Sequence, residues 1–349
     1  MTLPVSRTVG RCLATLGGVA AAAFPVPLPQ ERAGVTVRHG SLAEDLDVLH
    51  EGDRLWWGRD FLADRITTIP DGEPWALLVA DLDGRLAGDA FVVGRPVLQD
   101  GYAMASIFVR SGARQQGVGT ALARVIADAT VAWQLPGFAG QTHELDTEAR
   151  SAVEAMGFRE MGHHRESVLD LDRLDVAVAQ AAVAKAVGAG IVLRAFDDSA
   201  GDDDWQRLYD EVVAPTWRDA PDADGASEVM PLQVFRGFFP DPSYVLVAWR
   251  GDRPVGVTAV MDRSKDEALN TMFTGVLPSA RGLGVSTALK AQHALTMRDR
   301  GQHRLFTQNM DQNTRILAAN DRLGFEVVPG YVAVGCAVPW AGPARVTGG

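Results

Sequence analysis

Residues 109–122 read VRSGARQQGVGTAL, and residues 276–289 read VLPSARGLGVSTAL. In both stretches an Ala-Arg pair precedes a glycine-spaced loop that runs into Thr-Ala-Leu and an amphipathic helix. A loop that opens a helix directs several backbone N–H groups, and the positive end of the helix dipole, toward one point. Glycine lets the backbone approach a bulky anion there, and Arg114 or Arg281 adds a cation. Each stretch therefore predicts a site that binds a diphosphate.

A second signal recurs at the same spacing as the loops. The two loop arginines are 167 residues apart, and so are the Gly-Phe pairs at 157–158 and 324–325. A period of this size is too long for a solenoid repeat and matches the length of a whole domain. In both copies, strands precede the loop, and the closing strands are expected at 159–171 and 326–338. The pattern predicts an α/β fold (α+β, mixed sheet) present as two copies in tandem.

The domain boundaries follow from this repeat. We expect a flexible leader over residues 1–33, a first domain over 34–171 and a second domain over 191–340. An Ala- and Val-rich segment at 172–190 predicts a linker helix, and residues 341–349 form a tail. The leader carries two arginines before a short apolar run, so a secretory signal is the alternative interpretation.

The composition restricts the possible partners. The chain has 349 residues and a formal net charge of −11, which argues against nucleic acid or an anionic membrane as the main partner. No apolar run reaches the roughly 18 residues of a membrane span, and two cysteines far apart do not make a disulfide framework. We expect a cytoplasmic protein, a monomer or homodimer, that uses no metal.

The loop spacing differs from those of the common nucleotide-binding loops. A Walker loop needs Gly-Lys-Ser/Thr after four spacer residues, and a dinucleotide fingerprint needs a third glycine in register; both are missing. The pattern instead closely resembles the acyl-CoA loop of the GNAT acetyltransferase family, Gln/Arg-x-x-Gly-x-Gly/Ala. Residues 114–119 satisfy it fully, and residues 281–286 satisfy it except that Ser286 replaces Gly or Ala. The resemblance covers roughly residues 35–171 and 191–338, and it is to the tandem, two-domain type found in actinobacteria.

The resemblance implies where acetyl-CoA, or another acyl-CoA, would bind as co-substrate. The strand before each loop splays from the next strand, and its backbone pairs with the pantetheine arm. The loop amides hold the diphosphate. The residues implied in the first copy are Ile107, Phe108, Val109, Arg114, Gln115, Gly117, Val118, Gly119 and Thr120. Those implied in the second copy are Thr274, Val276, Arg281, Gly282, Gly284, Val285, Ser286 and Thr287.

The catalytic acid of many GNAT enzymes has no counterpart here. In that family a tyrosine four residues before the Gly-Phe pair protonates the departing thiolate. The corresponding residues are Val153 and Asn320, and neither can act as an acid. The proton then comes from water or from a residue elsewhere, or that copy is not catalytic. In the first copy His143, Glu144 and Asp146 follow the strand after the loop helix, where a base and an exposed charge are both open interpretations.

The second copy has more polar residues around the expected cleft. Its Thr-x-Asn at 307–309 and its later asparagines resemble a pattern of actinobacterial tandem GNAT proteins. Asn309 and Asn313 could hydrogen-bond the cofactor or order a water, and Asn313 could equally be a helix cap. Asp219 or Glu228 could select or deprotonate an amine, whereas an exposed loop charge is the alternative for Asp219.

These features predict an acyl-CoA-dependent N-acyltransferase, most simply an acetyltransferase. It would act on a small-molecule amine by direct attack in a ternary complex. We expect the chemistry in the second domain; the reverse assignment stays open, because the first loop matches the family pattern more closely. Two alternatives stay open. One is a catalytically inactive CoA-binding or scaffold protein, and the other is a GNAT-fold enzyme of different chemistry, such as an acyl-CoA decarboxylase or aminoacyl transferase.

Overall fold

The computed structural model describes residues 34–41, 69, 72–96, 101–196, 200–219, 229–239, 241–263 and 268–343. The expected leader over 1–33, most of the tail and the candidate base Glu228 lie outside the described residues.

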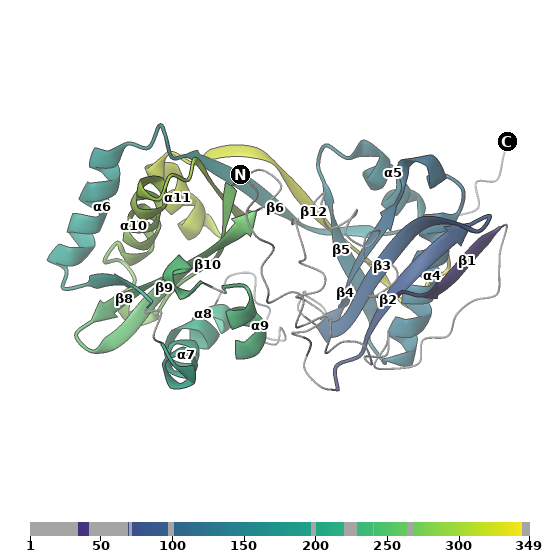
Figure 1. The fold of residues 1–349 in the computed structure, drawn as a ribbon, viewed down its shortest axis with the longest axis horizontal. Helices are drawn as coiled ribbons and strands as arrows, with labels where there is room; N and C mark the ends of the chain where they lie inside the picture. Colours follow the sequence, from purple (N-terminus) through teal and green to yellow (C-terminus); the bar gives the residue numbers. More distant parts are fainter. Residues whose placement is uncertain are drawn as a thin grey trace, which may run out of the picture.

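The chain forms two lobes (Figure 1). The elements of its first half, in order, are β1 Val35–His39, β2 Trp75–Leu82, β3 Arg85–Pro96, β4 Ala103–Val109, η2 Ser111–Ala113, α4 Val118–Ala132, β5 Gly137–His143, α5 Thr147–Ala155 and β6 Arg159–Asp170. Helix α6 Val176–Gly188 follows, inside the segment that the sequence predicts as a linker helix.

The second half repeats this order. Its elements are β7 Val192–Ala195, α7 Asp202–Leu208, η3 Tyr209–Val213, α8 Ala214–Arg218, α9 Leu232–Gly237, η4 Pro242–Tyr244, β8 Val245–Arg250, β9 Arg253–Arg263, β10 Ala268–Val276, η6 Pro278–Ala280, α10 Val285–Asp299, β11 Arg304–Met310, α11 Thr314–Leu323 and β12 Glu326–Ala337. In this lobe α6, α10 and α11 cover one face of the sheet, and α7, α8 and α9 cover the other (Figure 1).

Local chemistry explains several of these elements. Asp83 and Gly84 both have positive φ (50° and 72°), as a tight hairpin turn between β2 and β3 requires. From α7 to α8 the helix is continuous through the π-helical turn η3. Pro215 has no backbone N–H to donate within this helix, and a local π turn is one way to absorb such a loss. The acidic stretch at residues 216–230 is typical of a loop, but the helix extends through its first residues to Arg218.

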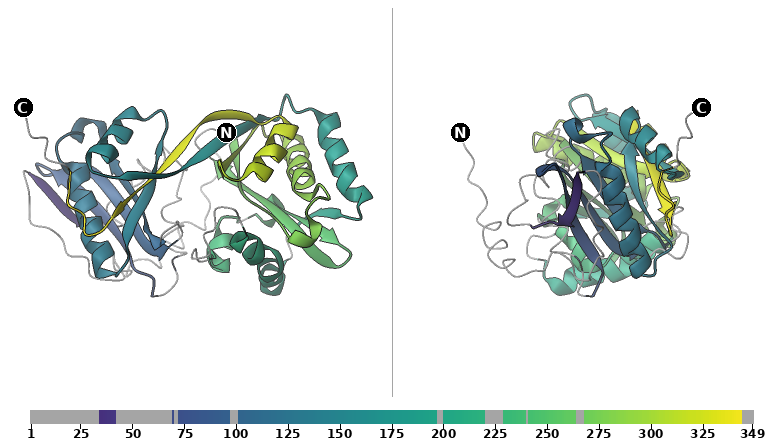
Figure 2. Two further views of the ribbon diagram at one scale, coloured as in Figure 1. Left: turned by 180° about the vertical axis from the view of Figure 1, so that it is seen from behind. Right: turned by 90° about the vertical axis from the view of Figure 1, so that its right-hand side faces the viewer.

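All twelve described strands belong to one sheet, in the order β1-β2-β3-β4-β5-β12-β6-β11-β10-β9-β8-β7. Strand β12 pairs with β5 through residues 331–337, and β6 pairs with β11 through residues 164–170. The two long strands also pair with each other and cross between the lobes (Figures 1 and 2). The sequence predicts that residues 159–171 close the sheet of the first copy. In the structure β6 pairs with β12 and β11, and β12 is the strand that lies beside β5. Each lobe receives the strand beside β5 or β11 from the other half of the chain.

The 167-residue period of the sequence is also the period of the structure. Helices α4 and α10 start at 118 and 285, β5 and β11 at 137 and 304, and β6 and β12 at 159 and 326, so each difference is 167. Each lobe has its own apolar core between the sheet and its loop helix. The first is built around Leu122 and Ile126 of α4, and the second around Leu289 and Met297 of α10; all four are fully buried.

Candidate functional site

Both copies contain a splay between the two parallel strands that flank the loop helix. Within the described strands, β4 and β5 pair at Ala103 and Met104, and no ladder pair joins them beyond that point. Likewise β10 and β11 pair from Leu269 to Thr271 and then separate, after an irregularity between Thr271 and Phe273. Residues 107–109 and 274–276 thus have no ladder partner on the side of β5 or β11 within the described strands, as the resemblance implies.

The N-terminus of each loop helix lies at the open end of its splay. Gly117 and Gly284 are the N-caps of α4 and α10 and have φ of 85° and 81°, a left-handed conformation that favours glycine. Glycine has no side chain that could accept from the first-turn N–H groups, so the described residues leave these donors available to an anion. These groups belong to Val118, Gly119 and Thr120 in the first copy. In the second copy they belong to Val285, Ser286 and Thr287.

The loop arginines make one bond in common and one that differs. Arg114 Nε donates to Val109 O, and Arg281 Nε donates to Val276 O, both at 3.3 Å. Arg114 also forms an ion pair with Glu148 of α5. Arg281 instead forms an ion pair with Asp219, which directly follows α8. The carboxylate of Asp219 thus lies beside the second glycine loop and contacts its arginine.

The two splays differ in charge where α5 and α11 begin. The N-cap and first turn of α5 carry Asp146, Glu148 and Arg150, a net charge of −1 from two acids and one base. The same positions of α11 carry one charged residue, Arg315, and a net charge of +1. Asp146 caps its helix by accepting from Ala149 N at 2.9 Å. Its counterpart Asn313 occupies the N-cap position but makes no side-chain cap bond within the described residues.

A pair of asparagines lies beside the second splay. Asn320 Nδ2 donates to Asn309 Oδ1 at 3.0 Å, and Thr307 Oγ1 donates to the same oxygen at 3.4 Å. Because an amide carries its oxygen and nitrogen on opposite sides, the NH₂ group of Asn309 faces away from both donors. Asn320 is 1% exposed and stands where many GNAT enzymes have tyrosine.

Two basic side chains are buried next to this pair. Lys290 and His293 of α10 are 1% and 3% exposed. Lys290 Nζ donates to Thr307 Oγ1 at 3.4 Å and lies 5.3 Å from the centre of the Phe325 ring. Burial lowers the pKa of Lys290 to about 7. Burial first, and then the charges of Arg300 and Lys290, lower the pKa of His293 to about 3.

Sequence reasoning did not identify Lys290 or His293 as site residues. Comparing the copies would have revealed them, because their counterparts 167 residues earlier are Ala123 and Ile126, both fully buried. The counterparts of Thr307 and Asn320 are Gly140 and Val153. The second copy has therefore placed polar groups at positions that the first copy fills with small or apolar residues.

A cluster of ions connects the two lobes. His163 of β6 contacts Glu144 through Nε2 at 3.0 Å and Asp311 through Nδ1 at 2.9 Å. Glu144 and Asp311 follow β5 and β11 and are 167 residues apart. Burial lowers the pKa of His163, but the bond to Asp311 and the charge of Glu144 outweigh it, so the pKa is raised overall. The bond from Gly330 N–H is the largest cause that lowers the pKa of Glu144. The expected basic role of Glu144 in the first copy thus competes with a structural one.

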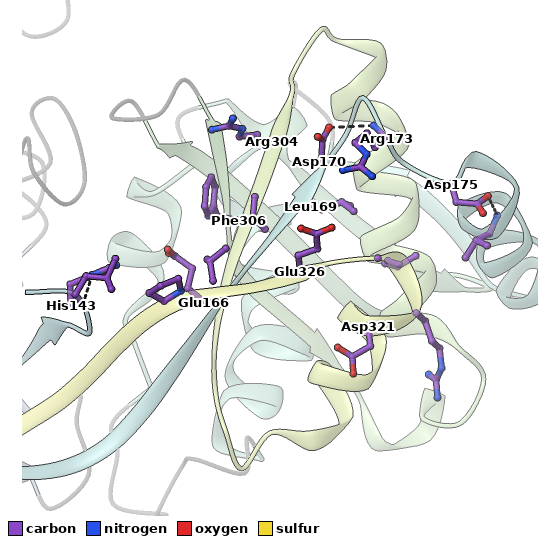
Figure 3. Close-up of a pocket in the computed structure, with 18 residues that line it drawn as sticks. His143, Glu166, Leu169, Asp170, Arg173, Asp175, Arg304, Phe306, Asp321 and Glu326 are labelled. Atoms are coloured by element: carbon purple, nitrogen blue, oxygen red, sulfur yellow. Dashed lines mark hydrogen bonds between the residues drawn. The ribbon is translucent and has the colours of Figure 1, made fainter.

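A cavity of about 760 Å³ lies on the β12-β6-β11 part of the sheet (Figure 3). Its lining includes five carboxylates and three guanidinium groups, so no single ligand charge is favoured. Neither glycine loop lines this cavity. The cavity is therefore separate from both glycine loops.

Two general features bear on cofactors and location. Among the described residues, no group of three or more His, Cys, Asp or Glu side chains is arranged to hold a metal ion. None of the described helices has the length and hydropathy needed to traverse a bilayer.

Comparison with known proteins agrees with this architecture. Residues 44–158 match the model of the Acetyltransferase (GNAT) family. No curated protein matches the chain. Among solved structures, a tandem GNAT protein from the clavulanic acid biosynthesis pathway (without AcCoA) shares the fold with a TM-score of 0.64 and 19% identity, over 87% of this chain and 98% of that one.

Two further structures are also similar in fold. A GCN5-related glucosamine N-acetyltransferase region of a fungal multi-domain GH3 β-N-acetylglucosaminidase has a TM-score of 0.63 and 16% identity, over 88% of this chain and 38% of that one. A GCN5-related N-acetyltransferase from Sphaerobacter thermophilus has a TM-score of 0.57 and 16% identity, over 89% and 97%.

Residues 44–158 thus match the GNAT acetyltransferase family, and the chain as a whole has the tandem GNAT fold. The fold class predicted from the sequence is confirmed.

Proposed function

We propose that this protein transfers an acyl group, most simply acetyl, from acyl-CoA to a small-molecule amine by direct attack in a ternary complex. The second domain carries the chemistry. The observation that supports this assignment is the polar group of Lys290, Thr307, Asn309 and Asn320 at the second splay. The first copy lacks this group.

Binding of acyl-CoA as substrate draws on the second copy's loop and strand. The first-turn N–H groups of α10 and the Arg281 guanidinium receive the diphosphate. Arg315, in the first turn of α11, adds a second cation at the open end of the second splay, and no described residue forms an ion pair with it. The unpaired backbone edge at 274–276 accepts and donates to the pantetheine amides, as an added strand would. The acyl group then reaches the vertex of the splay.

Asn309 polarises the thioester. Its amide oxygen is held by Thr307 and Asn320, so its N–H groups are the part that is available to the substrate. A donor that is already oriented stabilises the oxyanion formed when the amine attacks, without reorganising in the transition state. The ion pair between Asp219 and Arg281 favours a role for Asp219 at the cofactor loop over a role as base.

The first domain has the binding elements without the polar group. The charges at the start of α5 sum to −1 and those at the start of α11 sum to +1, while in each copy the loop arginine is paired with one acid, Glu148 or Asp219. CoA carries several negative charges, so the start of α5 attracts it less than the start of α11 does. We assign the first domain a supporting role, since its strand β6 completes the sheet of the second lobe.

The test is turnover with acetyl-CoA and a panel of amines that includes amino sugars, polyamines and amino acid amides, followed through the released thiol. Gly117→Glu places a carboxylate at the N-terminus of α4, and Gly284→Glu places one at the N-terminus of α10, so each variant obstructs one of the two expected diphosphate sites. Gly117→Ala and Gly284→Ala are the matched controls, because they impose the same strain at positive φ without the charge. Loss with Gly284→Glu alone supports the proposal, and loss with Gly117→Glu alone contradicts it. Binding of CoA without turnover on any amine favours the scaffold alternative.

A further inference from the structure

The thiolate that leaves acyl-CoA needs a proton, and the family's tyrosine is missing from both copies. In the second copy the missing position is Asn320, whose amide cannot supply one. A group that does so must lie near the vertex of the splay. Thr307 is the last residue of β11 that pairs with β10, opposite Thr271, so it marks that vertex. Its hydroxyl oxygen accepts a hydrogen bond from the Lys290 ammonium group.

We propose that Thr307 and Lys290 together protonate the departing thiolate, with Thr307 touching the sulfur and Lys290 acting through it. This inference rests on the proposed function, because it requires acyl-CoA in the second splay. It adds a proton source that neither the family pattern nor the loop motif provides.

The described partners of Lys290 do not compensate for the cost of burying its charge. Taking an ammonium group out of water costs several kcal/mol unless a partner compensates for it. The described partners of Lys290 are one hydroxyl at 3.4 Å and the face of Phe325, and neither carries a charge. The first copy closes the same helix against the same sheet with Ala123, which is fully buried. A lysine here therefore serves the site and not the core.

The proton transfer balances. The amine nitrogen forms a bond to the acyl carbon, and the carbon–sulfur bond breaks with its electron pair going to sulfur. The Thr307 hydroxyl turns from Asn309 Oδ1 toward the sulfur and gives up its proton, while Asn320 still donates to Asn309 Oδ1. Thr307 Oγ1 takes a proton from Lys290 Nζ, which becomes a neutral amine. The proton that the attacking amine loses goes to solvent, and Lys290 is reprotonated from solvent after CoA leaves. The products are an amide and CoA with a free thiol.

The surroundings of Lys290 suit this role. Its pKa of about 7 lies below the ordinary thiol value of about 8.5, so transfer to the thiolate is downhill. His293 is the titratable side chain that faces it from its own helix, and burial keeps that imidazole neutral. From the other elements, Thr307 of β11 and the ring of Phe325 contact Lys290, and both are uncharged.

The small number of lysines makes a direct test possible. The chain has three, Lys185, Lys265 and Lys290, so a protein labelled at the lysine Cε carbons gives three signals by NMR. Lys290→Met assigns the signal of interest. The probes are CoA and desulfo-CoA, which differ in the sulfur. The side chain of Lys185 lies against the loop glycine Gly284, so its signal reports whether either probe occupies the expected diphosphate site at the N-terminus of α10.

We expect the Lys290 signal to titrate near pH 7 and to shift with CoA but much less with desulfo-CoA, while the Lys185 signal shifts equally with both. Thr307→Val should remove this difference and Thr307→Ser should keep it. If the Lys185 signal shows that both probes bind and the Lys290 signal responds equally to them, the inference is overturned. If the Lys185 signal does not respond to CoA at all, the proposed function fails instead.

Turnover gives a second readout. Lys290→Met should lower kcat by about a hundredfold or more and leave the KM for acetyl-CoA unchanged. The wild-type kcat should fall as the pH rises above about 7, and that limb should vanish in the variant. A pH profile identical in both proteins contradicts the inference.

Discussion

His164 and Tyr331 occupy the same position in the two repeats and pair with each other in the sheet. A pseudo-twofold axis therefore passes between them. The same symmetry appears on both flanks, where Tyr331 pairs with His143 and His164 pairs with Met310. The exchange of β6 and β12 is thus reciprocal, with one register in both lobes.

The exchange predicts that neither half is stable by itself. A chain ending before residue 190 leaves the edge of β5 without β12, and a chain beginning there leaves β11 without β6. Each fragment then has an exposed edge of unpaired backbone groups. Expressed separately, the two fragments should lack a cooperative thermal transition, and co-expression should restore one by circular dichroism. A cooperative transition at the wild-type temperature in either fragment would refute this.

The ion cluster at His163 predicts a pH window for interlobe stability. A raised histidine pKa contributes stability that is complete below about 6.5 and is lost as the pH rises through the folded value. The lowered pKa values of Glu144 and Asp311 contribute stability above about 4.5 that is lost on acidification. The difference in unfolding free energy between wild type and His163→Gln should peak between about pH 4.5 and 6.5. Its size should be at most about 1 kcal/mol, because the groups are partly exposed. A difference independent of pH in urea titrations would contradict the assignment.

Charge reversal at Arg315 and at its counterpart Glu148 should have different effects on cofactor binding. Reversing the charge with Arg315→Glu should weaken CoA binding about tenfold, an effect of roughly 1.4 kcal/mol, and added salt should reduce the difference. Glu148→Arg, at the matched position, should leave the binding to the second domain unchanged. Calorimetric titrations at two salt concentrations measure both. Equal weakening by the two variants would show that the charge at the start of α11 is not the cause.

Lys290 predicts a cost in stability that depends on pH. Its pKa falls from 10.5 to about 7 on folding, so the unfolded chain binds more protons between these values. Stability should therefore rise with pH over this window by about 4 kcal/mol, at 1.36 kcal/mol per pKa unit. Lys290→Met should be more stable than wild type at pH 7, and the advantage should shrink toward pH 10. Denaturant titrations of both proteins across this range test the sign, and a less stable variant at pH 7 would contradict it.

Much of the fold could be predicted from the sequence, because the same local signals occur in both copies of the repeat. The 167-residue offset, the glycine loops and the hairpin at residues 83–84 each follow from local chemistry that the structure confirms. The strand exchange does not follow, because β6 and β12 have the same length and register. Alternation of side chains identifies the strands, but it does not say which copy of β5 or β11 each one joins.

The site was accessible only in part for a similar reason. Backbone binding leaves a glycine pattern in the sequence, so the loops were visible. A buried lysine leaves no pattern of its own, since one polar residue in an amphipathic helix normally indicates its exposed face. The contrast of Lys290 with Ala123 identifies it, once the copies are aligned and both positions are known to be buried.

The second domain is proposed to bind acyl-CoA for catalysis. The most direct measurement is the stoichiometry and affinity of acetyl-CoA binding to wild type, Gly117→Glu and Gly284→Glu by isothermal titration calorimetry. We predict that wild type and Gly117→Glu bind with the same affinity at the catalytic site and that Gly284→Glu loses this site. Binding that survives in Gly284→Glu and disappears in Gly117→Glu would contradict the account.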